Sequence, residues 1–172
     1  MEISAISPVN ELEWLDIREQ CNDFINRFGT RRHTQGELEQ LQKMPFNELH
    51  QPGTSLIAAT VRGEYGKAPV GVCFVSGFGQ KSFLIAIHPL YRNRNLGHSL
   101  ILSQKSTLGY LNCKVAVDNY SSLHICFDAG MHAIALERSS TGKPTLIMST
   151  CPMESPASNS MQEGDLLCLN QF

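Results

Sequence analysis

Residues 88–101, HPLYRNRNLGHSLI, place two arginines, two asparagines and a glycine between two apolar runs. The run before them, SFLIAI, has the composition of a buried strand, and the residues after them resemble the start of a helix. The first turn of a helix has about four backbone N–H groups without intrahelical partners, and together with the helix dipole they favour an anion. The loop therefore predicts an anion site made by backbone N–H groups, with Arg92 and Arg94 adding positive charge at its rim.

Two positions determine how the backbone of this loop can bend. Gly97 has no Cβ, so it would let the backbone approach a ligand closely. Asn95 stands where such loops usually have glycine, and asparagine is the non-glycine residue that best tolerates a positive φ. We predict a positive φ at Asn95. His98 would add its backbone N–H at the helix start, whereas the side chain of His88 is more typical of a packing or surface histidine.

The elements that must position this loop follow from cap residues and apolar periodicity. Asn10 and Glu13 have the spacing of a capping box, and apolar residues at intervals of three and four after them predict a helix that ends near Gly29. Thr34 and Glu37 repeat the cap spacing for a shorter second helix. The stretch 45–53 is expected to be a loop.

Strands and two further helices are expected in the rest of the chain. The expected order is strands at 55–63, 68–79 and 81–89, a helix at 96–108 capped by Gly109, a strand at 110–119, a helix at 121–131 and two strands within 132–150. This order predicts a mixed α/β sandwich in one domain, residues 1–150. Residues 151–172 are expected to form a loosely ordered tail, with the apolar end at 166–172 as a candidate for docking onto the domain.

Composition restricts the class of protein. The chain has 172 residues, 42% hydrophobic residues and a formal net charge of −2, which fits one globular domain and does not favour a nucleic-acid or membrane-surface partner. The amino terminus lacks the pattern of a signal peptide, and no apolar stretch approaches the roughly 20 residues that span a bilayer. Six scattered cysteines without a C-x-x-C pair predict reduced thiols in a cytoplasmic protein and no metal site.

The element order and two motifs resemble the GNAT superfamily of acyl-CoA-dependent N-acetyltransferases. The family loop has Arg or Gln, two residues, Gly, one residue and then Gly or Ala, after a strand that ends in a hydrophobic residue, any residue and Pro. Here IHP (87–89) and RNRNLG (92–97) match, with Asn95 in place of the first glycine. The second motif, VDNYSSLHICFDAGM, resembles a strand-to-helix pattern in which Asn119 is followed by Gly130 and Met131. The resemblance covers about residues 10–150 in element order and about 83–131 in motif detail.

The resemblance implies a mostly antiparallel central sheet with helices on both faces and middle strands that splay apart. It also implies direct transfer of an acetyl group from acetyl-CoA, as co-substrate and without a metal, to an amine. The backbone N–H of Ile87, with its neighbours, would face the oxyanion, the loop would hold the CoA pyrophosphate, and Asn119 would bind the pantetheine arm. The implied cofactor-binding residues are Ile85, Ala86, Ile87, Arg92, Asn93, Arg94, Asn95, Leu96, Gly97, His98 and Asn119.

Proton transfer in such a reaction needs an acid and a base. The family commonly has a tyrosine seven residues after the Asn of the second motif, and Cys126 stands at that position. This thiol is a candidate general acid or nucleophile, with an inert packing thiol as the alternative. Tyr120 lies nearby, but its offset does not match. Asp118, at the carboxyl end of its strand, and Glu64, in the hairpin turn, are the candidate general bases.

Three functions remain open from the sequence. The first is an N-acetyltransferase acting on an amine of a small molecule or a protein. The second is a non-catalytic CoA-binding module, motivated by Cys126 and Asn95. The third is a GNAT-like enzyme acting on nucleic acid, which depends on Arg31, Arg32 and the loop arginines and is disfavoured by the net charge of −2. The acceptor is not indicated, and the oligomeric state stays open, a homodimer included.

Overall fold

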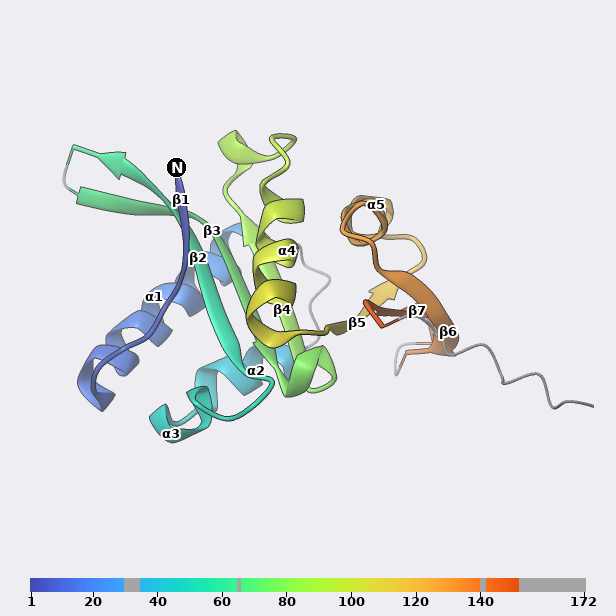
Figure 1. Cartoon of the computed structure of the whole chain (residues 1–172), viewed down its shortest axis with the longest axis horizontal. Coiled ribbons are helices and arrows are strands. Elements are labelled where there is room, and N and C mark those ends of the chain that lie inside the picture. Colours follow the sequence, from blue (N-terminus) through green and yellow to red (C-terminus); the bar gives the residue numbers. More distant parts are fainter. Residues whose placement is uncertain (30–34, 65, 140–141, 152–172) are drawn as a thin grey trace, which may run out of the picture.

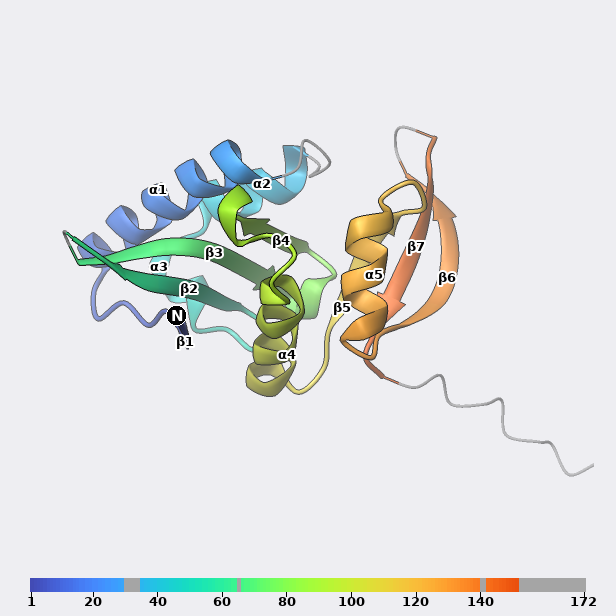
Figure 2. The same ribbon diagram turned by 90° about the horizontal axis from the view of Figure 1, so that it is seen from above.

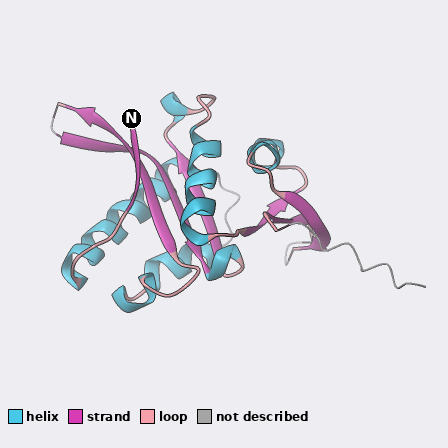
Figure 3. Cartoon of the chain, viewed as in Figure 1, coloured by secondary structure: helices cyan, strands magenta, loops and turns pink. Residues whose placement is uncertain are grey.

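Two antiparallel sheets and five α-helices make up the part of the chain that the structure describes (Figures 1 and 3). The structure is a computed structural model and describes residues 1–29, 35–64, 66–139 and 142–151. The helices are α1 (Glu11–Phe28), α2 (Gln35–Lys43), α3 (Phe46–Leu49), α4 (Leu96–Leu108) and α5 (Tyr120–Asp128). The strands are β1 (Glu2–Ala5), β2 (Ser55–Gly63), β3 (Gly66–Ser76), β4 (Ser82–Ile87), β5 (Asn112–Ala116), β6 (His132–Arg138) and β7 (Pro144–Ser149). The predicted mixed α/β class is confirmed.

The first sheet has the order β1-β2-β3-β4 and carries helices on both faces (Figure 2). Because successive side chains of a strand point to opposite faces, each strand supplies two apolar clusters. Leu56, Phe74 and Leu84 pack with α1, α2 and α3, whereas Ile57 and Cys73 pack with α4. The sheet is therefore buried on both sides, and β4 is held rigidly at its edge.

The second sheet has the order β5-β7-β6, and α5 lies between it and α4 (Figure 2). Among the described residues no ladder joins β4 to β5, so the two sheets meet where these strands adjoin. The backbone of the turn before β4 contacts the backbone at the start of β5, because a Cβ at Gly79 would lie 1.7 Å from the carbonyl oxygen of Asn112. Gly79 itself has a φ of +90°. The structure thus agrees with the expected splaying of the middle strands.

Cap residues define the helix ends as the sequence indicates. Asn10 accepts a hydrogen bond from the N–H of Glu13, and the Glu13 carboxylate accepts one from the N–H of Val9. The reciprocal bond therefore reaches the residue before the cap. Gly109 ends α4 with a φ of +83°, and its N–H donates to the carbonyl of Lys105.

Some elements differ from the sequence prediction. Strand β1 was not expected, because its four residues are too short for a periodic signal, and it is defined only by pairing with β2. The loop expected at 45–53 contains the single turn α3. The strand expected at 110–119 is shortened to Asn112–Ala116 because a turn precedes the cap of α5. Thr34 and the tail beyond residue 151 lie outside the described residues.

Candidate active site

The free edge of β4 faces the junction of the two sheets. The N–H of His88 donates to the carbonyl of Val70, so His88 points its backbone groups toward β3. Backbone groups of an antiparallel strand alternate in direction, and Ile85 and Ile87 must therefore point theirs away from β3. Their N–H groups lie at the open edge, as an oxyanion donor on β4 requires. Ala86 is the exception among the three expected residues, because its N–H is directed at β3 and its side chain is buried under α1.

The loop after β4 has the left-handed backbone that the sequence predicts at Asn95. Asn95 has φ 56° and ψ 12°, so this prediction is confirmed, and Asn93 is also left-handed with φ 59°. The first intrahelical bond of α4 runs from the N–H of Ser99 to the carbonyl of Asn95. The N–H groups of Leu96, Gly97 and His98 precede that bond and begin the helix. Left-handed residues followed by a helix start form the kind of N–H concavity that binds anions.

The two loop arginines have different surroundings, although both are exposed. The Arg92 guanidinium donates from Nε to the carbonyl of Ile87 (3.2 Å) and from Nη2 to the carbonyl of Phe28 (2.9 Å). The Arg94 guanidinium lies over the ring of Tyr91, 5.5 Å from its centroid. Arg92 is therefore engaged by backbone carbonyls, whereas Arg94 remains at the rim of the loop.

Gly97 has a packing role that its position in the loop did not suggest. A Cβ at this residue would lie 3.0 Å from Ile125 Cδ1 and 3.2 Å from Ile87 Cδ1. Gly97 is buried, and it lets α4 approach both the end of β4 and α5. Packing of α4 against Ile87 and Ile125 is thus a second reason for glycine here. The close ligand approach expected from the sequence stays a prediction.

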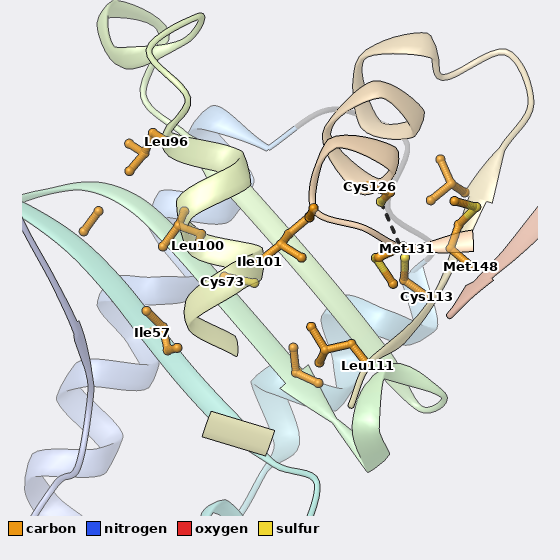
Figure 4. Packing of buried hydrophobic residues seen from close by; sticks show 14 of the residues in the cluster. Ile57, Cys73, Leu96, Leu100, Ile101, Leu111, Cys113, Cys126, Met131 and Met148 are labelled. Carbon is orange, nitrogen blue, oxygen red and sulfur yellow. Dashed lines mark hydrogen bonds between the residues drawn. The ribbon is translucent and has the colours of Figure 1, made fainter. Parts of the chain in front are cut away.

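The side chain of Cys126 points from α5 into the core, toward Cys113 on β5 (Figure 4). Its side chain is 3% exposed, and its sulfur lies 3.8 Å from the sulfur of Cys113. Helix α5 ends in a Schellman motif, in which the N–H groups of Gly130 and Met131 donate to the carbonyls of Phe127 and Cys126. This end directs Cys126 and Met131 toward the same cluster, which explains the Gly-Met pair of the second motif.

The ionisation of these thiols follows from their burial and their contact. The hydrogen bond with Cys126 and the apolar surroundings raise the pKa of Cys113 well above its ordinary value. The same hydrogen bond lowers the pKa of Cys126, and burial opposes that change. Burial raises the pKa of Cys73 to about 12. The geometry favours the packing alternative for Cys126 over the acid and nucleophile alternatives.

The three other expected side chains occupy separate places. Asn119 caps α5, and its Oδ1 accepts from the N–H of Ser122 at 3.4 Å. Asp118 lies at the end of β5 and forms an exposed ion pair with Lys143 at 3.3 Å. Glu64 is in the β2–β3 turn, and Gly71, which pairs with Ile87, is five residues from the turn end of β3, about 17 Å along the strand. The structure therefore does not bring Glu64 near the end of β4.

The histidines beside the loop also differ in role. The His88 Nδ1 accepts from the N–H of Leu90 at 3.3 Å, and its ring lies 4.6 Å from that of Phe28. This confirms the packing interpretation of His88. His98 is partly buried in the first turn of α4. Arg31 and Arg32, on which a nucleic-acid acceptor would depend, lie outside the described residues.

Metal clusters, membrane spans and surface hollows are the other features considered for the described residues. No group of three or more His, Cys, Asp or Glu side chains there could hold a metal ion. None of the described helices is both long and apolar enough to cross a membrane. Two surface hollows of ≈ 190 and ≈ 140 Å³ lie beside β1, and neither touches the edge of β4.

Solved structures with the same arrangement are acetyltransferases. Mutant forms of the spermidine/spermine N-acetyltransferase SpeG from Vibrio cholerae are 14% identical to this chain, with 86% of this chain and 91% of that one covered at a TM-score of 0.57. The NatC complex bound to Gag peptide and CoA is 12% identical, with 87% and 98% covered at a TM-score of 0.60. A GNAT-family structure from Desulfovibrio desulfuricans is 15% identical, with 86% and 98% covered at a TM-score of 0.58. No family model and no curated protein matches the sequence. The chain therefore has the GNAT fold.

Proposed function

From a GNAT fold with an open β4 edge, we propose that this protein is an N-acyltransferase that moves an acetyl group from acetyl-CoA to an amine. The observation that carries the proposal is the sequence of backbone groups from Ile85 to His98. Free-edge N–H groups at the end of β4 are followed by a 3₁₀ turn at Pro89–Tyr91, the left-handed residues Asn93 and Asn95, and the start of α4. Such a series suits a thioester at one end and a pyrophosphate at the other.

In the proposed reaction the amine nitrogen attacks the thioester carbonyl carbon, and the C–S bond then breaks. The Ile87 N–H donates to the oxyanion that forms, and the Ile85 N–H pairs with the pantetheine arm along the same edge. The Asn119 amide, whose oxygen caps α5, has its nitrogen left to donate to that arm. The backbone N–H groups of the loop and of the start of α4, up to His98, hold the pyrophosphate.

The amine loses its proton to Asp118 or to water beside it. Asp118 is the proposed base because it closely follows β5, the strand that adjoins β4, whereas Glu64 lies in the β2–β3 turn. The departing thiolate takes a proton from solvent, because Cys126 faces the core. The similar solved structures include a spermidine/spermine N-acetyltransferase and a complex bound to a peptide. The proposed acceptor is accordingly an amine on a small molecule or a peptide. The free thiols among the described cysteines support the proposed cytoplasmic location.

A non-catalytic CoA-binding module is the second candidate. The burial of Cys126 supports this candidate. The family commonly has a tyrosine at this position, and here the side chain is buried in the core and is not available as an acid. Both candidates predict CoA binding, and only the first predicts turnover.

Binding is tested by calorimetry and by thermal stabilisation with acetyl-CoA, with desulfo-CoA and free pantetheine as ligands for comparison. Substitution of Gly97 is unsuitable for this test because its packing would fail first. We expect wild type to bind acetyl-CoA, and a protein that neither binds CoA nor is stabilised by it would refute both candidates.

Turnover is tested by mass spectrometry with acetyl-CoA and a panel of polyamines, aminoglycosides and peptides with free amino termini. Acetylated amine together with free CoA supports the transferase. CoA binding without acetylated product from any amine supports the binding module, and an Asp118→Asn variant that keeps full kcat excludes Asp118 as the base.

A further inference from the structure

Arg92 bonds to two carbonyls that belong to distant parts of the chain. Its Nε donates to Ile87 at the end of β4, and its Nη2 donates to Phe28, 64 residues away at the end of α1. A guanidinium presents its donors in a rigid planar fork, so it can bridge two fixed acceptors in a way that a single ammonium cannot. The carbonyls at a helix C-terminus also attract a cation.

The partial negative charge of the Ile87 carbonyl oxygen would destabilise an oxyanion beside it. This carbonyl lies on the same edge of β4 as the Ile87 N–H, because both groups of one residue point the same way in an antiparallel strand. An unpaired carbonyl there would present negative charge beside the position where the oxyanion forms. The bond from Arg92 satisfies this carbonyl, and Ile87 is left as a net donor at the open edge.

Aromatic side chains near Arg92 also connect the end of α1 to the end of β4. The Phe28 ring packs against the ring of His88 at 4.6 Å and against Phe24 at 4.9 Å. His88 in turn receives the N–H of Leu90. The end of α1 and the end of β4 are therefore joined by one cluster, in which Arg92 supplies the polar contacts.

Arg94 provides an internal contrast. It belongs to the same loop, but its guanidinium lies over the Tyr91 ring and, among the described residues, no hydrogen bond from it is found. We propose that Arg92 is a positioning residue for acyl transfer, which fixes the β4 terminus against α1 and neutralises the Ile87 carbonyl, and that it does not contact the phosphates of CoA. This inference rests on the proposed transferase function.

Two charge-conserving variants test the proposal, Arg92→Lys and Arg18→Lys, with Arg92→Gln as the charge-removing variant. Arg18 is the matched control, because its guanidinium also donates to a backbone carbonyl, that of Met44, but it lies on α1 outside the loop and the β4 edge. Each is assayed with acetyl-CoA and the best amine of the panel at a temperature well below its melting point, with circular dichroism to show that it is folded. For Arg92→Lys we expect kcat to fall about tenfold with little change in the Kd of CoA, because an oxyanion donor is misplaced while the charge remains. Arg18→Lys should keep both values within about twofold of wild type.

Three results would overturn the inference. If Arg92→Lys behaves as wild type and only Arg92→Gln weakens CoA binding, Arg92 acts through its charge on the phosphates. If Arg92→Lys lowers the melting temperature but leaves kcat unchanged, its role is structural alone. If Arg92→Lys raises the Kd of CoA as much as it lowers kcat, the loop as a whole has moved. Failure of the proposed function is recognised separately, because wild type itself would then show no CoA binding or no transfer.

Discussion

The two sides of the junction between the sheets, called here the first and the second wall, are built on different principles. The first wall, formed by β4, the loop 92–97 and α4, presents backbone groups at the free edge of β4. The second wall, formed by β5 and α5, turns the side chain of its candidate residue, Cys126, into the core. Backbone geometry can be kept while side chains change, and the difference teaches that the proposed CoA binding would depend on backbone conformation more than on residue identity.

The largest expected effect is at the base, where the two walls touch. Gly79→Ala places a Cβ 1.7 Å from the Asn112 carbonyl oxygen, at a φ of +90°, so the walls must move apart. We expect a loss of about 3 kcal/mol or more in the free energy of unfolding, measured with urea. Gly109→Ala is the control, because its φ is also positive but nothing lies within 4 Å. It should cost about 1–2 kcal/mol from backbone strain alone. Equal losses for the two variants would show that the walls are not in contact there.

The second prediction concerns the side chain of the second wall. Cys126→Ala removes a buried sulfur and leaves the Cys113 thiol without its partner, and we expect a loss of about 2 kcal/mol in unfolding free energy. CoA affinity and the rate of acetyl transfer, measured where the variant is folded, should stay within about twofold of wild type. A variant that is folded but loses transfer would place Cys126 in the chemistry and erase the contrast between the walls.

The first wall should respond to backbone conformation at Asn95. Asn95→Val forces a β-branched residue to a φ of 56°, and we expect a stability loss of about 1–2 kcal/mol and CoA binding that is about tenfold weaker. Asn95→Gly should bind CoA as wild type does, because glycine adopts this conformation without strain. Calorimetry measures both affinities. Weak binding by the glycine variant would assign a role to the Asn95 side chain itself.

Sequence reasoning succeeded where the signal is local. The cap of α1 at Asn10, the bounds of α4 and the positive φ of Asn95 each depend on a few neighbouring residues. It missed what long-range contacts decide. The partner of Arg92 lies 64 residues away, and the need for glycine at 97 comes from Ile125 on another helix. Helical spacing on α5 could not show which of its faces is buried, and the roles expected for Cys126 were open for that reason.

The smallest expected effect is a pH dependence from Cys73, which lies on β3 behind the first wall. Burial raises the pKa of this thiol from 9.0 to about 12, whereas in the unfolded chain it ionises near 9. Its contribution to stability is therefore complete below pH 9 and decreases as the pH rises from about 9 toward 12, because only the unfolded state releases the proton. By pH 10 the loss should be on the order of 1 kcal/mol. The measurement is the free energy of unfolding at pH 8 and pH 10 for wild type and Cys73→Ala. The difference between the two proteins should shrink by that amount, and a difference that does not change with pH would show that the thiol behind the first wall is open to solvent.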